Sequence, residues 1–583
     1  MLLHRLSLLA LALLALLLPF ELETPWLTLG PVVLTNVELL LWAVLGLTAL
    51  TAWQSARQGA AGAGWPKLPR AWLLLLGLSV LGLLVSSALA PAYRGNALKA
   101  TLRTLSGLAL MGSVVVLVRS RRDLRWVVGG LLGGGLAAAA LGLAEIVRNA
   151  EYGLLRAFRP GPTAVGPFLR LTGPFDYANQ TAMFFEATLP LLVVLGWALW
   201  RRGKTAPALL AGVAFILVAE AAILTLSRTS FATLIAANLI VALILWLRQR
   251  AFLPSAALFA GAAAAIAILI GVNGLFNPVF RLRFSSESDT AWYMARLDVP
   301  DELNLAAGEA RQVQVTVAND GVFTWRSIGS RPVRLAARWT QPENALQLQS
   351  YPRWPLAGPL ASGESQTLTI ELQAPREAGQ YLLVWDLVQE NVTWFSAKTG
   401  IEGTTAVTVT GVAPPVADES WELGLGTFEA AWEIDPPIPG RRTLWQAAYQ
   451  LWRGRPLMGI GLDNYRLRYG EVLGYQSWNR TIHTNNWYIE TMVSLGLLGA
   501  VPFFAWLGLL VWGIVRGVGR AGAQLWPAAV AAGLLAYLVH GLLDYFLLFN
   551  ATGLLFWLLA GLWVRLAGDQ GVAVETEPPL PPA

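Results

Sequence analysis

The chain has 583 residues, of which 55% are hydrophobic and only 13% charged, and its mean hydropathy is +0.53. This composition is too apolar for an ordinary soluble enzyme and indicates a protein that crosses a membrane several times. The net charge of +6 does not point to nucleic acid as a partner, because the basic residues form short clusters between hydrophobic runs. The absence of Cys excludes disulfides and thiolate metal sites.

Runs of about 20 apolar residues, the length that crosses a hydrocarbon core of roughly 30 Å, occupy both ends of the chain. We expect a polytopic α-helical membrane protein with about twelve spans, nine of them within residues 1–272 and three within 486–567. Residues 568–583 are expected to form a disordered cytoplasmic tail. The predicted spans lie near 2–19, 31–53, 71–90, 97–118, 124–147, 178–200, 206–226, 227–247, 252–272, 486–515, 524–548 and 551–567.

The short loops between these spans alternate in charge. One set contains Arg57, Lys67 and Arg70, then "RSRRDLR", "RRGK" and "RQR", and finally Arg516 and Arg520. The alternate loops "ELETPWLTLG", "PAYRGN" and "LFNAT" contain a single arginine between them. The positive-inside rule therefore predicts a multi-pass protein of the cell membrane with both termini in the cytoplasm. The two long loops, 148–177 and 273–485, are then extracytoplasmic.

Some charged residues fall where this topology disfavours them. Arg170 lies in the first long outer loop, and Arg228 lies at the outer turn between the seventh and eighth predicted spans. These arginines are either solvated or snorkelling side chains, or they form an anion site that binds phosphate bidentately. Glu145, Glu186 and Glu220 lie within predicted spans, toward the outer half, and are functional candidates for that reason.

Residues 287–411 of the second long loop predict a separate β domain. Apolar residues alternate with polar ones, and Gly, Pro and Asn-Asp interrupt the pattern at short intervals, which is typical of an antiparallel β-sandwich. The segments "NDGVFTW" and "APREAGQYLLVWDLV" resemble Ig-like modules of extracellular proteins. The domain has no paired acids and no Ser–His spacing, so we expect a binding or spacer module. Its predicted strands are "RQVQVTVAND", "RPVRLAARWT", "SQTLTIELQAP", "GQYLLVWDLVQ" and "TTAVTVTG".

Residues 412–485 are expected to return the chain to the membrane and to supply part of an active site. In "GRRTLWQAAYQLWRGRP", apolar residues recur at helical spacing with arginines at both ends, which predicts an interfacial amphipathic helix. The segment that follows leads to His483, one of only three histidines, at the start of the tenth predicted span.

Five sequence blocks resemble the O-antigen ligase and O-antigen polymerase superfamily of bacterial membrane glycosyltransferases. In chain order they are "RLTGPFDYANQTAMFFEATLPLL", "LTLSRTSFATLIAANL", "GRPLMGIGLDNYR", "HTNNWYIETMVSLGLLGAVPFF" and "HGLLDYFLLFNATGLLFWLLAGL". They cover most of the membrane part, whereas the Ig-like insertion is not part of the usual family pattern. The resemblance implies a GT-C-like scaffold that needs no metal or cofactor. It also implies transfer of a glycan from a polyprenyl diphosphate carrier to the hydroxyl of a glycan or lipid acceptor, on the outer side of the membrane.

The resemblance also implies roles for single residues. Arg228 matches the arginine of the family's "SR" block and is implied as a diphosphate ligand, with Arg170 as a second. Arg480 lies within three residues of His483 and is either a third ligand or a solvated loop arginine. His483 is implied as the base that removes the acceptor proton. Asn179 matches the polar position that opens the sixth span and is implied to position the substrate, with helix capping as the alternative role.

One departure from the family pattern concerns the histidine. Counting back from "GLLG", the family usually has His-Asn where this chain has Asn485 and Asn486, so His483 lies two positions early. Asparagine cannot act as a base. Either a short irregular turn returns His483 to the catalytic position, which we favour, or the usual base has been lost and His483 only orients the loop. Asn485 and Asn486 are expected to position the substrate.

His540 and Asp544, in "HGLLDY", are spaced i, i+4. On one helix they are expected to pair, either to position the substrate or to join two helices.

Two other functions stay open: a flippase or transporter for lipid-linked glycans, and a membrane-anchored sugar-binding protein. A transporter predicts internal repeats, broken helices and ionisable residues near the membrane midplane. The sequence has no convincing repeat, and its unusual charges gather at one surface, which favours the glycosyltransferase.

Overall fold

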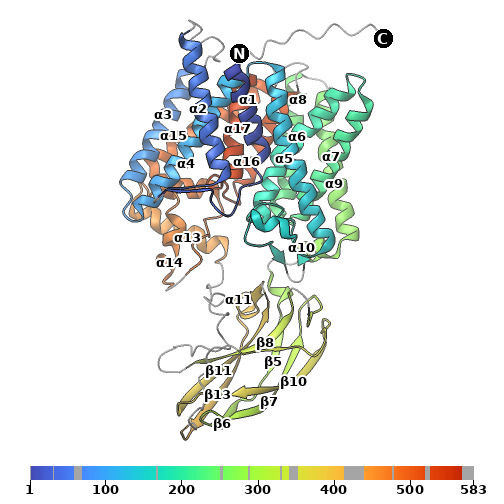
Figure 1. The fold of residues 1–583 in the computed structure, drawn as a ribbon, viewed down its shortest axis with the longest axis vertical. Helices are drawn as coiled ribbons and strands as arrows, with labels where there is room; N and C mark the ends of the chain where they lie inside the picture. The colour runs from blue at the N-terminus through green and yellow to red at the C-terminus, as the bar shows by residue number, and fades with distance from the viewer. Residues whose placement is uncertain are drawn as a thin grey trace. The chain divides into compact units, whose positions relative to one another are not determined.

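The structure is a computed structural model, and the chain divides into two compact units (Figure 1). One unit is helical and comprises Met1–Thr163, Arg170–Asn277 and Pro439–Ala583; the other is rich in β-sheet and comprises Ala164–Leu169 and Pro278–Ile438. The described residues are 2–29, 32–57, 68–165, 168–249, 254–285, 289–328, 331–340, 352–390, 392–412, 439–475, 478–518 and 525–567. The expected C-terminal tail and residues 413–438 of the expected outer loop lie outside them.

In the described parts of the helical unit, ten helices are long and apolar enough to cross a membrane. They are α2 (Asn36–Arg57), α3 (Arg70–Ala88), α4 (Arg94–Leu117), α5 (Arg121–Arg148), α6 (Ala178–Trp200), α7 (Thr205–Leu224), α8 (Arg228–Gln249), α9 (Pro254–Phe276), α15 (Trp487–Val518) and α17 (Asn550–Ala567). The short elements of this unit are β1 (Leu27–Leu29), β2 (Val32–Leu34), η1 (Gly153–Ala157), α13 (Arg441–Gly454) and α14 (Tyr465–Leu473).

The prediction of twelve spans is not matched. The first and eleventh predicted spans correspond to shorter apolar helices, α1 (Leu2–Leu17) with 16 residues and α16 (Trp526–His540) with 15 residues. Helix α1 ends just before Pro19, since the residue preceding a proline disfavours helical geometry. Helix α16 ends at His540 because the chain turns at Gly541, although the apolar run continues to residue 548.

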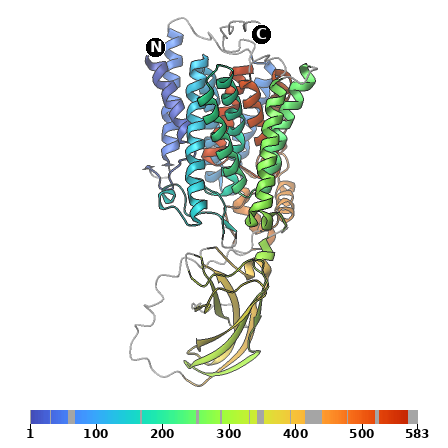
Figure 2. The same ribbon diagram turned by 90° about the vertical axis from the view of Figure 1, so that its right-hand side faces the viewer.

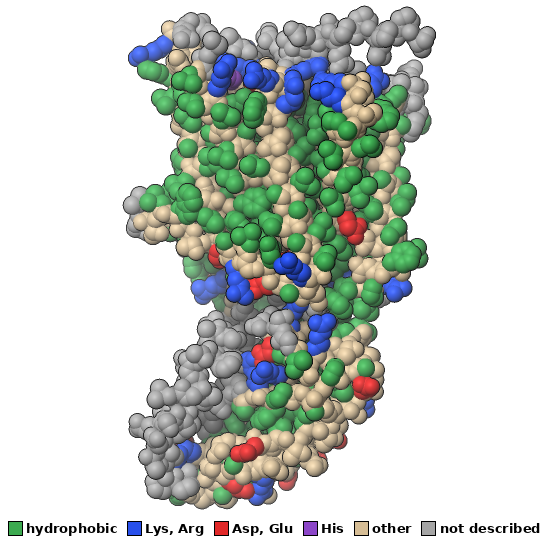
Figure 3. Space-filling view, turned by 45° about the vertical axis from the view of Figure 1, so that its right-hand side comes forward, with side chains coloured by type: hydrophobic (Ala, Val, Ile, Leu, Met, Phe, Trp, Pro, Cys, Tyr) green, Lys and Arg blue, Asp and Glu red, His purple; other side chains and the backbone are tan. Residues whose placement is uncertain are grey.

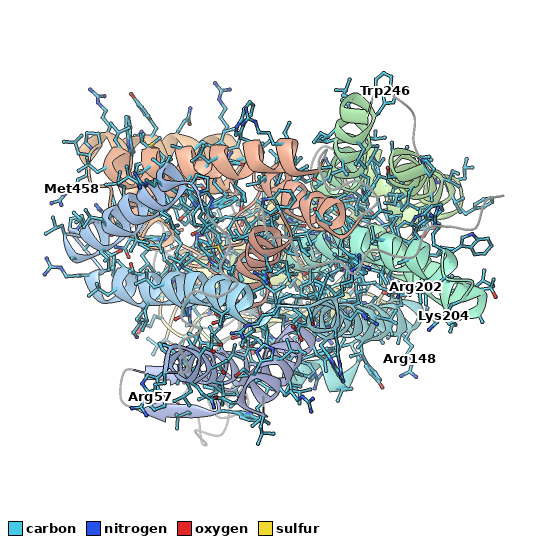
Figure 4. The ribbon with its side chains drawn as sticks, turned by 90° about the horizontal axis from the view of Figure 1, so that it is seen from above. Arg57, Arg148, Arg202, Lys204, Trp246 and Met458 are labelled. Carbon is cyan, nitrogen blue, oxygen red and sulfur yellow. The ribbon has the colours of Figure 1, made fainter. Side chains whose placement is uncertain are left out.

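Successive helices of the bundle alternate in direction (Figures 1 and 2). The basic loops at Arg57, Arg121 and Arg202 therefore lie at one end, and the starts of α6, α8, α15 and α17 lie at the other. Figure 3 shows Lys and Arg side chains gathered at the first end, beside a broad hydrophobic flank. Viewed along the bundle, Arg57, Arg202 and Lys204 lie at its periphery (Figure 4). The outward flank is apolar, since Leu210 is 70% exposed.

Close contacts between helices depend on small residues. Gly130 and Gly134 of α5 face α1, where a Cβ on either would overlap the carbonyl oxygen of Ala12 or Leu16. This small-xxx-small spacing lets two backbones approach closely, as it does between helices in membranes.

The sheet-rich unit is a β-sandwich whose two sheets enclose one hydrophobic core. All five predicted strand segments lie in strands, which confirms those predictions, but the expectation of a wholly antiparallel sandwich is wrong for one pair. Strand β6 runs parallel to β13, because the chain crosses between the sheets directly after β5.

The first sheet has the order β10 (Ser365–Gln373), β7 (Ala310–Asn319), β5 (Ala295–Asp298). The second has the order β6 (Glu302–Ala306), β13 (Gly403–Thr410), β11 (Gly379–Gln389), β8 (Val333–Thr340), β9 (Arg353–Pro355), with β12 (Thr393–Trp394) beside β11. The other elements are β3 (Ala164–Val165), β4 (Phe168–Leu169), α10 (Pro278–Ser285), η2 (Asp289–Trp292) and α11 (Ser396–Thr399).

Candidate functional site

A break in α15 anchors the first part of the candidate site. Gly496 has a φ of +60° inside this helix, a conformation that side chains with a Cβ rarely adopt. The segment 456–461 fills the break, and within it the backbone N–H of Gly461 donates to the carbonyl oxygen of Ser494 at 3.0 Å. The sequence block that ends in Asp463 is thereby fixed against α15.

The chain enters α15 through an irregular turn at residues 483–486. Asn485 has a φ of +51°, in the left-handed region that asparagine tolerates better than most residues. Asn486 caps the helix, because its Oδ1 accepts the backbone N–H of Ile489 at 2.9 Å while its Nδ2 donates to the carbonyl oxygen of Leu542 at 2.7 Å. The irregular turn that we expected before this helix is therefore present, and it leaves His483 only 8% exposed.

Two carboxylates flank the ring of His483. Its Nδ1 lies 3.3 Å from Oε1 of Glu490, and its Nε2 lies 3.9 Å from Oδ1 of Asp463. Glu490 is fully buried in the first turn of α15, and its Oε2 accepts the backbone N–H of Thr484 at 3.0 Å. With Glu490 accepting from Nδ1–H, the neutral ring presents Nε2 as its basic atom.

Burial and charge act in opposite directions on His483. Burial by itself lowers the pKa of His483, but the charge and hydrogen bond of Glu490, together with the charge of Asp463, raise that pKa above its ordinary value on balance. An imidazole accepts a proton near neutral pH, which is the property that a general base requires.

Asp463 is itself held in place by Arg466. The guanidinium donates to both carboxylate oxygens, at 2.6 and 2.7 Å, and Asn96 donates to Oδ2 at 3.1 Å. This hydrogen-bonded pair raises the pKa of Arg466 above its ordinary value. Arg466 also donates to the backbone carbonyl of Arg480 at 2.9 Å, so the same side chain holds the loop that precedes His483.

Four residues of this site were not predicted from the sequence: Asn96, Asp463, Arg466 and Glu490. The sequence contained a signal for three of these four residues. Asp463 and Arg466 are spaced i, i+3 in "LDNYR", and Glu490 is an acid in the first helical turn after His483, where negative charge is favoured. No sequence signal placed Asn96, on α4, beside them.

A second polar cluster lies at the same end of the helical unit. Arg170 donates from Nε to the carbonyl oxygen of Thr225 at 2.8 Å and from Nη2 to Oδ1 of Asn179 at 3.0 Å. Asn179 donates in turn to Oδ2 of Asp544 at 2.7 Å. Asn179 thus bridges Arg170 and Asp544, and it does not cap α6, whose N-cap is Tyr177. Its role in positioning the substrate stays a prediction. Thr225 lies three residues before Arg228, so Arg170 contacts the turn that leads into α8, the helix that begins at Arg228.

The predicted pair of His540 with Asp544 on one helix is wrong. Helix α16 ends at His540, and Asp544 lies in the turns that follow. The Nδ1 of His540 instead lies 2.9 Å from Oε1 of Glu186 on α6. The i, i+4 rule failed here because it holds only while the helix continues.

Aromatic rings connect the two clusters. The ring centroid of His483 lies 6.3 Å from that of Phe549, which lies 5.5 Å from that of Tyr177. The hydroxyl of Tyr177 is 3.5 Å from Oδ1 of Asp544. Two aromatic rings, those of Phe549 and Tyr177, therefore lie between the candidate base and the Arg170 cluster. The third predicted ligand, Arg480, is exposed, and its guanidinium lies 5.6 Å from the ring centroid of Trp478.

The three glutamates within predicted spans all have partners. Glu145 pairs with the buried Arg159, Glu186 with His540, and Glu220 accepts two hydrogen bonds from Asn273. No group of three or more His, Asp or Glu side chains suited to a metal ion occurs among the described residues.

No protein-family model and no curated protein matches the chain. Among solved structures, a crystal structure of a CARDB domain from Pyrococcus furiosus, in complex with di-metal ions, is 17% identical over 20% of this chain and 86% of that chain, with a TM-score of 0.15. A solution structure of the same domain is 16% identical over 20% of this chain and 93% of that chain, with a TM-score of 0.13.

The alkylpurine DNA glycosylase AlkC of Pseudomonas fluorescens, bound to DNA, is 10% identical over 59% of this chain and 100% of that chain, with a TM-score of 0.14. With TM-scores this low, none of these similarities supports a fold or a function for the chain. The resemblance to O-antigen ligases rests on the five sequence blocks alone.

Proposed function

We propose that the chain is a metal-independent membrane glycosyltransferase of the O-antigen ligase or polymerase type, acting in the synthesis of surface polysaccharide. It would transfer a glycan from a polyprenyl diphosphate carrier to an acceptor hydroxyl at the outer face of the cytoplasmic membrane. The observation that carries the proposal is the buried imidazole of His483, oriented by Glu490 on one side and facing Asp463 on the other.

The helical unit supports a place in the membrane. Ten of its helices have the length and hydropathy of spans, and leucines such as Leu210 face outward. The basic loops lie at the end opposite the candidate site. If the positive-inside rule sets the orientation, the basic end is cytoplasmic and the site with His483 faces the outside, together with the inserted β-sandwich.

The proposed reaction is a displacement at the anomeric carbon of the donor sugar. His483 Nε2 takes the proton of the acceptor hydroxyl as that oxygen forms its bond to the anomeric carbon. The bond from this carbon to the diphosphate oxygen breaks, and the diphosphate leaves with the electron pair. Glu490 keeps the ring in the required tautomer and stabilises the imidazolium that forms, as the carboxylate of a catalytic triad does.

Arginines neutralise the leaving group in this mechanism. Arg170 contacts the turn that leads into α8, the helix that begins at Arg228, and Asn179 and Asp544 fix the guanidinium of Arg170 before the substrate arrives. Fixed cations aimed at a developing negative charge stabilise the transition state without reorganisation. Arg480, in the loop before His483, is the third proposed ligand.

A transporter of lipid-linked glycans is the second candidate. The break in α15 at Gly496 favours it, because broken helices line the sites of many transporters. Against it, the charged clusters gather at one end of the bundle, whereas an alternating-access site lies near the midplane.

One experiment separates the two candidates. The purified protein, in nanodiscs and in the presence of a chelator, is given a polyprenyl diphosphate-linked oligosaccharide and an acceptor glycan or lipid. The glycosyltransferase predicts a covalent product and stoichiometric release of polyprenyl diphosphate. A transporter predicts no product, and instead movement of the intact donor between the leaflets of proteoliposomes.

A further inference from the structure

Helix α13 (Arg441–Gly454) has two distinct faces, and one of them has no partner in the described structure. Its apolar face is buried against α14 and α15, in a core that includes Leu444, Leu451 and Tyr465. We expected this helix to lie in the membrane interface, but its apolar face is covered by protein and is not available to a bilayer. Its opposite face carries Arg442, Gln446, Tyr449, Gln450 and Arg453, all exposed.

These five side chains form one continuous stripe. They recur at i, i+4, i+7, i+8 and i+11, which is a single face of an α-helix. They also line most of an open hollow of about 690 Å³ along the helix, together with Trp445. A second open hollow shares Gln450 with the first and is bordered by Arg455 and Arg468. The stripe therefore continues into a second open hollow beside it.

The stripe is basic and has no compensating acid of its own. Helix α13 contains no Asp or Glu, and neither Arg442 nor Arg453 makes a hydrogen bond or ion pair within the described residues. Other arginines nearby are engaged, since Arg441 donates to the carbonyl oxygen of Leu543 and Arg455 to that of Leu89. The two unengaged guanidinium groups are suited to carboxylate or phosphate.

The remaining side chains of the stripe are suited to an anion that also carries sugar groups. The amides of Gln446 and Gln450 both donate and accept hydrogen bonds, as neighbouring sugar hydroxyls require. Tyr449, which is 58% exposed, offers a flat apolar ring with a polar tip. Arg442 and Arg453 are eleven residues apart, about 16 Å along the helix, so one ligand can engage both only if its charges repeat along a chain. A single phosphate or one lipid headgroup does not meet that requirement.

The stripe is connected to the candidate site. Trp445 lines the hollow, and its indole N–H donates to the backbone carbonyl of Thr484 at 2.9 Å, directly after His483. A chain lying along α13 would therefore lie beside the loop that carries the proposed base.

We propose that the outward face of α13 binds an acidic glycan, a sugar chain with repeating carboxylate groups, and holds it next to the His483 loop. This inference rests on the proposed glycosyl transfer, because it describes how the polymer substrate is held. The arginines bind the carboxylates, the glutamines bind hydroxyls, and Tyr449 packs on a sugar ring. The bilayer would cover the same face if α13 lay on anionic lipid, which is the alternative that the test must exclude.

Binding is measured on the purified full-length protein in phosphatidylcholine nanodiscs, with oligogalacturonate as the acidic probe and dextran oligomers of equal length as the neutral probe. We expect the acidic chain to bind more tightly than the neutral chain, and its affinity to fall with added salt. The double substitution Arg442→Gln and Arg453→Gln should weaken acidic-chain binding about tenfold or more. The matched control Arg202→Gln, an exposed arginine at the opposite end of the bundle, should leave it unchanged.

Because the chain has no cysteine, Gln446→Cys provides a unique label on the stripe. Oligogalacturonate should slow its reaction with a water-soluble maleimide in phosphatidylcholine nanodiscs. Equal binding of acidic and neutral chains, or unchanged binding by the double variant, would overturn the proposal. Protection of the label by phosphatidylglycerol alone, with no effect of the glycan, would identify a lipid-facing helix instead. The His483→Ala protein should bind the probe normally. Loss of transfer therefore tests the proposed function, and loss of glycan binding tests the role of α13.

Discussion

Replacing Glu490 by Gln tests how His483 is oriented. The carboxylate accepts two hydrogen bonds, from the ring of His483 at 3.3 Å and from the backbone N–H of Thr484 at 3.0 Å. An amide has only one acceptor oxygen, so one of these buried donors loses its partner. If the amide group instead donates to Nδ1, the proton of the ring moves to Nε2, and the ring no longer has a basic atom directed at the acceptor hydroxyl.

The size of the effect follows from the lost acceptor. Glu490 stabilises the imidazolium that forms in the transition state, and a hydrogen bond to a charged group contributes about 1.5–3 kcal/mol, so kcat should fall between about 10-fold and 150-fold. Loss of the negative charge also lowers the pKa of His483, since Glu490 raises that pKa more than Asp463 does. A base acts only when deprotonated, so the acid limb of the pH–rate profile should move to lower pH.

The assay is the initial rate of glycan transfer by the purified protein at saturating donor, followed across pH. Glu220→Gln is the matched control, because Glu220 is also a hydrogen-bonded glutamate of the helical unit but lies on α7, bonded to Asn273. That control should retain the parental rate and pH profile. A Glu490→Gln protein with both the parental kcat and the parental acid limb would refute the proposed orientation of His483.

Three further predictions concern other parts of the chain. Arg228→Lys keeps the charge but loses the planar fork, so transfer should fall strongly at normal protein level, whereas Arg202→Lys at the opposite end should not change it; parental activity of the first variant would remove Arg228 from the site. Replacing residues 287–411 by a short linker should leave membrane insertion and transfer intact, since the β-sandwich has its own core, and failure of the variant to accumulate would contradict this. Burial raises the pKa of Asp386 to about 7 although it accepts hydrogen bonds from Ser396 and Leu387, so this group favours the folded sandwich most in acid and loses that contribution as pH rises through about 7. The protection factors of the β11 amides against hydrogen exchange, which are corrected for intrinsic base catalysis, should therefore fall as pH rises through about 7, and Asp386→Asn should remove this fall; a variant that keeps it would assign the pH dependence to another group.

The sequence predicted the elements whose signal is periodic. Strands such as β7 and β11 alternate apolar and polar residues with a period of two, and α13 repeats its apolar residues at helical spacing, so each was located from the sequence. Hydropathy located the helices of the bundle but not the end of α16, because it does not register a turn within an apolar run. That turn is fixed by a distant contact, in which the backbone N–H of Trp487 donates to the carbonyl oxygen of Gly541 at 2.7 Å.

The candidate site was only partly predictable, because contacts between residues distant in the sequence complete it. His483 stood out as a rare residue at a polar-to-apolar boundary, and Arg170 and Arg228 stood out because they oppose the charge rule. The partner of His540 could not be found, since Glu186 is 354 residues away in the sequence. A residue pair separated by several helices becomes visible only when the helices are packed.

The most direct test of the proposed function is transfer by the His483→Ala protein, measured together with donor binding. A general base contributes about 10²–10⁴-fold, so the variant, correctly inserted in nanodiscs, should show a loss of transfer of that size. Its affinity for the polyprenyl diphosphate donor should stay close to the parental value, because that affinity depends on the arginines. Asn485→Ala, at a half-buried neighbour with no side-chain hydrogen bond among the described residues, should be milder. A His483→Ala protein that transfers glycan at the parental rate across the pH range would contradict the proposed mechanism.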